Sequence, residues 1–239
     1  MVRTETARRA AGAFWSDARR RDALVIVLTL VTGSVDAIGL IRLGGVFTSV
    51  MTGNMVFLGI AVSERSGSIA LHTGVAFLAY VLGSFLGARV AGHAPPDEAH
   101  PWPKTIVWAL AVELGVLVVF ALWWELVHGA PSSDATYLLL GLNAMALGIQ
   151  SAAVLRFGVS GLSTTYLTGT LTQFVAGFTK RDEPVQVRSG LILLMLIVGA
   201  GLGALCALHA PLAAPFVPIG ALVVVTVGAW AAFHRGRRA

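Results

Sequence analysis

The feature that most constrains this chain is a series of apolar stretches, several of them about 20 residues long, joined by short polar connections. A helix of that length crosses the hydrocarbon core of a bilayer. Only 12% of the residues are charged, whereas about 25% is usual in a soluble domain. The stretches also lack the alternating polarity that the strands of a membrane barrel need. We therefore expect an all-α integral membrane protein, because helices satisfy their own backbone groups in lipid.

Eight apolar segments are predicted to be helices. The second and sixth are shorter and half polar. In the second, GVFTSVMTGNMVFLGIAV, the polar residues Thr48, Ser49, Thr52 and Asn54 interrupt the apolar run. The segments cover residues 21–41, 46–62, 70–90, 105–128, 135–155, 162–178, 191–209 and 212–233.

The chain matches itself when it is shifted by 116 residues without a gap. The coinciding positions are a Thr-Gly step in each short segment and a GxxxG motif in each segment that follows: Thr52-Gly53 on Thr168-Gly169, and Gly83/Gly87 on Gly199/Gly203. We expect two homologous halves, 22–128 and 129–234, between basic tails at 1–21 and 235–239. The GxxxG motifs predict faces where helices pack closely, and one arrangement would pack the two motifs against each other.

Two topologies remain open at this point. If the short segments are broken or re-entrant, six helices span the membrane and the halves are inverted. If the short segments cross, eight helices span it and the halves are parallel. With the N-terminus inside, six spans leave only Arg42 and Arg65 outside, whereas eight spans move Arg89, Lys104 and Arg156 outside. The positive-inside rule therefore favours six spans, with both termini on the cytoplasmic side of a bacterial inner membrane.

Ionisable groups inside apolar segments are functional candidates because they are costly in a membrane. Asp36 lies in the first segment and Glu113 in the fourth. Either carboxyl group is a candidate carrier of a coupling proton. The alternative is that each one serves packing by pairing with a backbone group or a buried arginine. Arg42 is the candidate partner of Asp36.

The short segments indicate a second kind of candidate site. We expect each Thr-Gly step to break its helix and expose backbone groups, as in the inverted repeats of many secondary transporters. The alternative is that these small and amide side chains serve helix packing and interhelical hydrogen bonds. The candidate substrate- or ion-binding residues are Asp36, Thr52, Gly53, Asn54, Gln150, Thr168, Gly169 and Gln173.

Several function classes are disfavoured by what the sequence lacks. Its six histidines show no metal-ligand spacing, and it has neither a Walker motif nor a G-x-S-x-G elbow. We therefore expect no metal, no cofactor and no enzymatic activity. Much of the net charge of +5 comes from arginines near the two ends. Such ends suit an anionic membrane surface and are not taken as a sign of nucleic-acid binding.

The stretch GSVDAIGLIRLGGVFTSVMTGNMVFLG resembles the signature of the YoaK-like family of bacterial membrane proteins, which is grouped as a domain of unknown function. The matching features are Asp36-Ala37, Gly45, Phe47, Met51-Thr52-Gly53-Asn54 and Leu58-Gly59. The second half keeps Thr168-Gly169 but has Thr170 where the first has Asn54. The resemblance implies an inner-membrane protein with about six spans, of a kind sometimes described as a small-molecule transporter. It supplies no substrate and no catalytic residues.

The leading hypothesis is a secondary transporter or permease for an unidentified small solute, with its site between the two halves. The alternative is a non-transporting membrane module, such as a sensor, an assembly factor or a partner subunit. An intramembrane enzyme would need a cluster of acid/base or metal-binding groups, which the sequence does not show. The lipid bilayer is the partner that the sequence predicts, and a homo-oligomer stays open.

Overall fold

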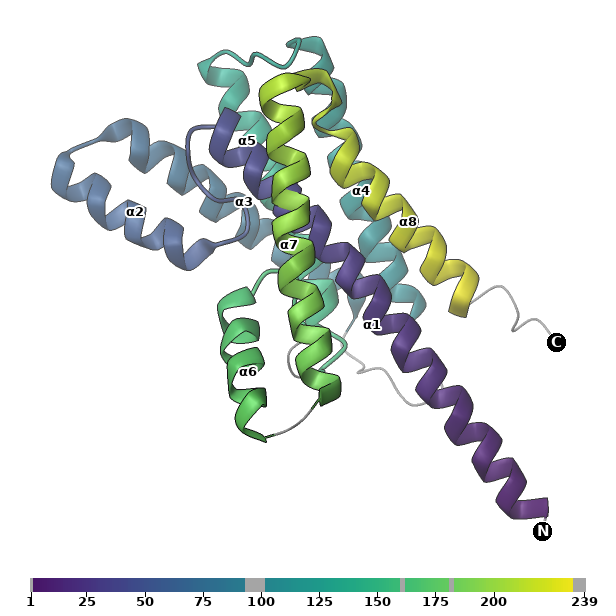
Figure 1. The fold of residues 1–239 in the computed structure, drawn as a ribbon. Coiled ribbons are helices and arrows are strands. Elements are labelled where there is room, and N and C mark those ends of the chain that lie inside the picture. Colours follow the sequence, from purple (N-terminus) through teal and green to yellow (C-terminus); the bar gives the residue numbers. More distant parts are fainter. Residues whose placement is uncertain (1, 93–101, 160–161, 181–182, 234–239) are drawn as a thin grey trace.

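A computed structural model describes residues 2–92, 102–159, 162–180 and 183–233, with side chains described from residue 17 onward except at 179–185. All of its regular elements within these ranges are helices (Figure 1). In chain order they are α1 (Val2–Arg42), α2 (Met51–Glu64), α3 (Gly67–Ala91), α4 (Lys104–Leu126), α5 (Ser133–Leu155), α6 (Leu167–Lys180), α7 (Glu183–His209), the 3₁₀ turn η1 (Pro211–Ala213) and α8 (Phe216–Phe233).

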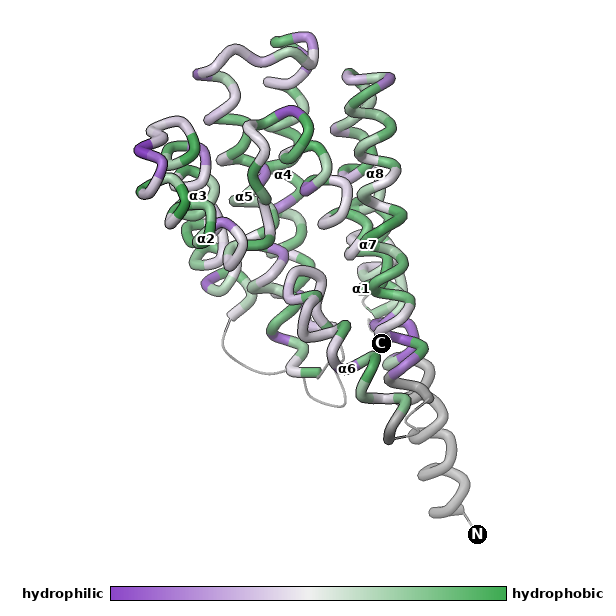
Figure 2. Tube along the Cα trace, turned by 60° about the vertical axis from the view of Figure 1, so that its left-hand side comes forward, coloured by the Kyte–Doolittle hydropathy of each residue, from purple (hydrophilic) through white to green (hydrophobic). Residues whose placement is uncertain are grey.

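Six helices in the described ranges are long and apolar enough to cross a membrane, and Figure 2 shows their mostly apolar course. These candidate spans are Asp17–Arg42, Gly67–Ala91, Lys104–Leu126, Ser133–Leu155, Gln186–His209 and Pro211–Phe233. Helices α2 and α6 have 14 residues each. At 1.5 Å per residue each is about 21 Å long, which is short of the ~30 Å hydrocarbon core. The prediction of six spanning and two short helices is confirmed, and the eight-span alternative lacks the required length.

The expected break at the Thr-Gly steps is wrong. Both steps lie in the first turn of a helix, Thr52-Gly53 in α2 and Thr168-Gly169 in α6. In the first half the helical path is interrupted earlier, over residues 43–50. Gly44 and Gly45 there have φ values of +95° and +71°. Glycine adopts this left-handed region easily because it has no Cβ atom.

Other boundaries differ from the expected ones in a simple way. Helix α1 begins at Val2 rather than near residue 21, and α7 begins at Glu183 rather than near residue 191. Apolar periodicity marks only the part of a helix that is buried or in lipid, so polar extensions escape it. Pro184 lies in the first turn of α7, where a proline removes no intrahelical hydrogen bond.

Two pairs of parallel helices form the centre of the fold. Helix α1 packs along α7, and α3 packs along α5. In the first pair a Cβ atom on Gly203 would lie 2.6 Å from the Ser34 carbonyl oxygen, and one on Gly199 would overlap the Leu30 carbonyl oxygen. Backbones approach this closely only where a residue lacks a side chain, as in membrane helix pairs with small residues at the interface.

The second pair uses its GxxxG motif in the same way. A Cβ atom on Gly87 would lie 2.7 Å from the Ile149 carbonyl oxygen, and one on Gly83 would overlap the Met145 carbonyl oxygen. The structure therefore does not pack the two motifs against each other. Each motif faces the first helix of the other half, because α3 pairs with α5 and α7 pairs with α1.

The long helices form two groups, and each group contains helices from both halves of the chain. Figure 2 shows α1, α7 and α8 together on one side, with α3, α4 and α5 beside them. Helix α2 packs on α3, and α6 packs on α7. The chain therefore crosses from one group of helices to the other directly after α1 and again directly after α5.

The two ends of the bundle can be distinguished by their contacts. At one end the ring of Trp102, just before α4, lies 4.9 Å from Phe157, just after α5, and 5.9 Å from Phe233 at the end of α8. At the other end Trp124 of α4 donates a 2.8 Å hydrogen bond to the Pro211 carbonyl oxygen of η1. The first helix of each half, α1 and α5, therefore runs in the opposite direction to the other, as inverted halves require. A common origin of the halves stays a prediction.

Candidate functional site

The Asp36 carboxylate anchors the connection that leaves α1. Its Oδ1 accepts hydrogen bonds from the Thr48 backbone N–H at 2.8 Å, the Thr48 hydroxyl at 2.7 Å and the Ser49 backbone N–H at 2.9 Å. Its Oδ2 accepts a hydrogen bond from the Ser49 hydroxyl. All four partners are donors, which suits an acceptor-only carboxylate. They compensate a polar group that is only 8% exposed.

The expected pairing of Asp36 with Arg42 is wrong. The Arg42 guanidinium instead donates from Nε at 2.9 Å and from Nη2 at 2.6 Å to the Ala207 carbonyl oxygen of α7. Donors on the 43–50 connection reach Asp36 because that connection folds back over α1. Asp36 therefore fits part of the packing alternative, since two of its partners are backbone groups.

Neutral side chains hold the corresponding place in the second half. The Ser151 and Thr165 hydroxyls share a 2.8 Å hydrogen bond. The Gln150 amide donates at 2.8 Å both to the Thr164 hydroxyl and to the Thr32 hydroxyl of α1. The connection after α5 is therefore hydrogen-bonded to α5, just as the connection after α1 is hydrogen-bonded to α1. The second half uses neutral side chains where the first half uses a carboxylate.

A cavity of about 460 Å³ lies between the two halves. It is bounded by α1, by α7, by the connection before α2 and by the connection and first turn of α6. Its polar lining consists of Asp36, Ser49, Thr165 and Thr168. The cavity thus joins the anchored connections of both halves at one place.

The predicted site residues divide into two groups. Asp36 and Thr168 line the cavity. The residues outside its lining are Thr52, which is exposed, Gly53 beside Phe47, Asn54, which is buried against its own connection, Gln150, which bridges α5 to α1, Gly169 beside Tyr166, and the half-buried Gln173.

The structure gives Asn54 a defined local role. Its Oδ1 accepts a 3.2 Å hydrogen bond from the Phe47 backbone N–H, and its Nδ2 donates at 2.7 Å to the Phe47 carbonyl oxygen. Both backbone polar groups of the half-buried Phe47 thereby have a hydrogen-bond partner. Asn54 therefore shapes the connection that carries Ser49 to the cavity.

Sequence reasoning missed Ser49 and Thr165 as lining residues. They coincide at the same shift of 116 residues that aligned the Thr-Gly steps, and both carry a hydroxyl group. That coincidence was the available signal. The Thr-Gly steps three residues further along are the more conspicuous match, but they lie inside helices.

Comparison with known proteins bears on the whole of this region. The family described as "Protein of unknown function (DUF1275)" matches residues 24–228. The chain belongs to the DUF1275 family. The UPF0700 transmembrane protein YoaK of Bacillus subtilis (strain 168) is 32% identical over 190 residues, covering 77% of this chain and 81% of that protein. No solved structure matches the chain.

The family match includes every lining residue of the cavity, since these run from Gly33 to Ala204.

A second buried carboxyl group within the family match lies outside the cavity lining. Glu113 of this DUF1275 protein is fully buried in α4, and its two carboxyl oxygens have no hydrogen-bond partner among the described residues. Asn143 of α5 is equally buried, and its amide also lacks a partner within the described ranges. Unpaired polar groups are costly in a low-dielectric interior.

Glu113 and Asn143 both lie near the middle of their helices. Helices α4 and α5 are consecutive, antiparallel and in contact. Trp102 and Phe157 meet at one end of this hairpin, and the short 127–132 connection closes the other. The two residues are therefore at a similar depth in the membrane. In the described part of the chain, no three His, Cys, Asp or Glu side chains come together as metal ligands would.

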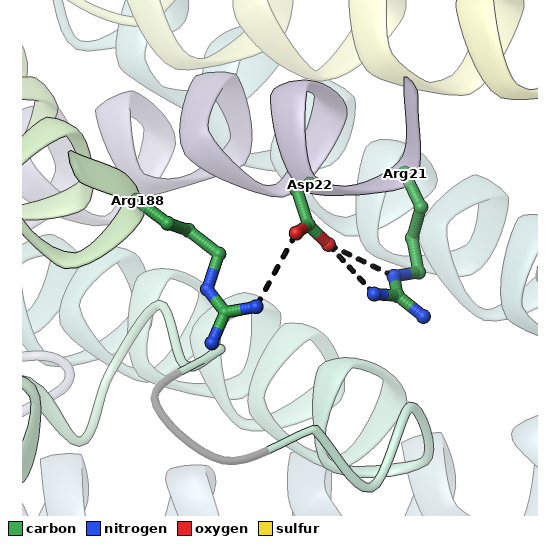
Figure 3. A network of polar contacts seen from close by, with 3 residues as sticks. All are labelled: Arg21, Asp22 and Arg188. Carbon is green, nitrogen blue, oxygen red and sulfur yellow. Dashed lines mark hydrogen bonds and ion pairs between the residues drawn. The ribbon is translucent and has the colours of Figure 1, made fainter. Parts of the chain in front are cut away.

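A charged network ties α1 to α7 at the end of the bundle that holds Phe157. Figure 3 shows Asp22 between Arg21 and Arg188. Asp22 Oδ1 accepts from Arg21 at 2.8 Å, and Asp22 Oδ2 lies 3.3 Å from Arg188. The Arg21 guanidinium also lies 6.0 Å from the centre of the Phe157 ring. With Arg42 bound to Ala207 at the other end, the α1–α7 pair is fastened at both ends.

Proposed function

We propose that this DUF1275 protein is a secondary transporter or permease for a small solute, and that the cavity between its halves is the solute site. The observation that carries the proposal is the position of the cavity, which receives polar groups from corresponding connections of both halves. Its volume of about 460 Å³ falls within the range usual for small-molecule sites. Transporters with inverted halves commonly place their substrate at such a junction.

The distribution of basic residues supports a cytoplasmic location for both termini. Arg89, Lys104 and Arg156 lie at or next to helix ends on one side of the bundle, and Arg21 and Arg188 lie where α1 and α7 pass that side. Far fewer basic residues belong to the opposite side, where Arg42 and Arg65 lie. The excess of Lys and Arg marks the cytoplasmic side in bacterial membranes. The bacterial inner membrane is therefore the proposed location.

Glu113 is the proposed carrier of a coupling proton. Asp36 already accepts four hydrogen bonds that hold a connection in place, so the structure gives its carboxylate an anchoring role. Glu113 holds no described segment in this way. Intramembrane carboxyl groups of this kind serve as proton relays in pumps and transporters.

The proposal is tested by filling the cavity. The protein is reconstituted in liposomes, and a panel of labelled amines, alcohols, sugars and carboxylates is assayed for uptake. Ala204 lines the cavity, whereas its neighbour Leu205 is 57% exposed. We expect Ala204→Trp to abolish the flux of the transported compound and Leu205→Trp to leave it unchanged.

The opposite result has a clear meaning. If no compound enters faster than in empty liposomes, or if both tryptophan variants transport normally, the cavity is not a transport site. Stable co-purification with one other membrane protein would then favour the non-transporting module. The partner would have to contact mainly the membrane-embedded surface, because the connections between the helices are short.

A further inference from the structure

We infer that the cavity selects small organic cations, with an ammonium group beside Asp36 and an apolar body against the remaining wall. This inference rests on the proposed function, because it names the class of solute for the same site. It is carried by the chemistry of the lining, by the hydrogen bonds of Asp36 and by the position of Arg42. None of these three observations depends on whether the bound compound is then moved across the membrane.

The cavity wall combines one acid with a largely apolar surface. Asp36 is its single ionisable residue, and no Lys, Arg or His is among the described residues that line it. Most of the remaining wall is aliphatic or aromatic, and its large members are Leu40, Ile41, Phe47, Val50, Leu167 and Leu196. A charged solute that enters this low-dielectric space must be paired with an opposite charge. Only a cation finds such a partner here.

Asp36 retains capacity for one more donor. A carboxylate offers about four acceptor positions, two on each oxygen. Three donors share the two positions on Oδ1, whereas among the described residues only the Ser49 hydroxyl binds Oδ2. Because Asp36 lines the cavity, the open position on Oδ2 is the place for a donor from a solute.

An ammonium group also matches the hydroxyl groups of the wall. It has three N–H donors and no acceptor. One donor fits the open position on Asp36. The others can be accepted by the Ser49, Thr165 and Thr168 hydroxyl oxygens, which line the same cavity. A carboxylate solute would place its negative charge beside Asp36, and the described lining residues include no basic group to offset it.

Arg42 does not neutralise the site. Its guanidinium is held by the Ala207 carbonyl oxygen through two hydrogen bonds, of 2.9 and 2.6 Å. It is not among the described lining residues of the cavity. Because Arg42 is held elsewhere, it does not neutralise the negative charge of Asp36, and that charge is available to a solute.

The inference is tested by binding rather than by transport. The full chain is placed in lipid nanodiscs, and benzylamine, benzyl alcohol and benzoate are compared by saturation-transfer NMR and calorimetry. The three probes share a phenyl ring and differ in charge. We expect benzylamine to bind at least about tenfold more tightly than benzyl alcohol. We expect no binding of benzoate above that seen with empty nanodiscs.

Two variants separate charge from shape. Asp36→Asn can keep its fold, because Oδ1 still accepts from Thr48 and Ser49 while Nδ2 donates to the Ser49 hydroxyl. We expect it to lower benzylamine affinity to that of benzyl alcohol. Ala204→Trp leaves Asp36 intact and fills the cavity, so it should remove binding of both compounds. Leu205→Trp is the matched control and should bind as the unaltered protein does.

The outcomes distinguish this inference from the proposed function. Equal affinity for benzylamine and benzyl alcohol, preferred binding of benzoate, or unchanged selectivity in a folded Asp36→Asn variant would each overturn the cation site. If Asp36→Asn fails to fold, the Ala204→Trp and Leu205→Trp pair decides whether benzylamine binds in the cavity. Selective benzylamine binding without uptake of any amine by liposomes supports the cation site and contradicts transport.

Discussion

Gly33 of α1 and Gly148 of α5 lie 115 residues apart and make the same kind of contact. A Cβ atom on Gly33 would overlap the Leu196 carbonyl oxygen and lie 2.8 Å from the Ala200 backbone nitrogen of α7. A Cβ atom on Gly148 would overlap the Tyr80 carbonyl oxygen and lie 2.8 Å from the Ser84 backbone nitrogen of α3. The two helix pairs are therefore built alike. The glycines of α1 and α5 are 115 residues apart, whereas the residues that they contact in α7 and α3 are 116 residues apart.

This register explains why the two halves are not chemically equivalent. At a spacing of 115 residues the counterpart of Asp36 is Ser151, and both contact the connection that follows their own helix. A gap-free shift of 116 residues places Asp36 on Ala152 and hides the correspondence. One half therefore supplies a carboxylate to the cavity region and the other a hydroxyl.

The close packing of α1 and α7 predicts a sharp difference between two neighbouring glycines. Gly199→Ala should lower the free energy of unfolding by about 1–3 kcal/mol, because the new methyl group overlaps the Leu30 backbone. A Cβ atom on Gly201 would have no atom of the described residues within 4 Å beyond its own helix backbone. Gly201→Ala should be neutral or stabilising by up to ~1 kcal/mol through helix propensity. Thermal denaturation of the purified variants in detergent measures both, and equal midpoints would contradict the parallel α1–α7 contact.

Thr52 and Asn54, the two polar residues of the Thr52-Gly53-Asn54 stretch, should contribute differently to stability. Asn54→Ala removes both hydrogen bonds to the half-buried Phe47 and leaves its backbone groups without these partners, so we expect a loss of about 1–3 kcal/mol in stability. Thr52 is exposed, and Thr52→Ala is its matched control with an expected change near zero. Chemical denaturation followed by tryptophan fluorescence compares the two. A stability loss for Thr52→Ala as large as that for Asn54→Ala would show that the 43–50 connection is held differently.

The proposed proton carrier predicts a change in coupling rather than in fold. Glu113→Gln keeps the shape of the side chain and removes its titratable group. We expect uptake in liposomes to lose its response to an imposed proton gradient while exchange of solute across the membrane continues. Glu125→Gln, on the same helix near its end, should keep the response. An unchanged gradient response in Glu113→Gln would remove Glu113 from the coupling step.

The proposed orientation predicts opposite accessibility for two exposed positions. In a Cys206→Ala background, Ser63→Cys at the end of α2 should react with an impermeant thiol reagent in intact cells. Lys104→Cys, at the start of α4, lies at the opposite end of the bundle and should react only after lysis. Labelling of both positions from outside, or of Ser63→Cys only after lysis, would exclude the six-span topology with cytoplasmic termini.

The sequence by itself determined the class of this protein and most of its elements. Length and polarity alone are enough to mark a span, because a helix in lipid has few alternatives. The short segments were also recognisable, since polar residues interrupt them and the predicted ranges 46–62 and 162–178 are near the lower length limit for crossing a membrane. Motif resemblance then indicated the family correctly, on the strength of residues such as Asp36 and Asn54.

Only the tertiary structure decided which polar groups meet. The apolar pattern places Arg42 just after the helix that holds Asp36, but it gives no information on the connection that folds back over that helix. The 43–50 connection binds Asp36 in place of Arg42, because its two backbone N–H groups and two hydroxyls satisfy the carboxylate better than one flexible guanidinium. The pairing of Gly199 with α1 and of Gly83 with α5 was equally hidden, because a GxxxG motif marks a close approach without naming the partner. The cavity depends on the fold of the connections and on the pairing of the helices, since it forms where two connections distant in sequence come together.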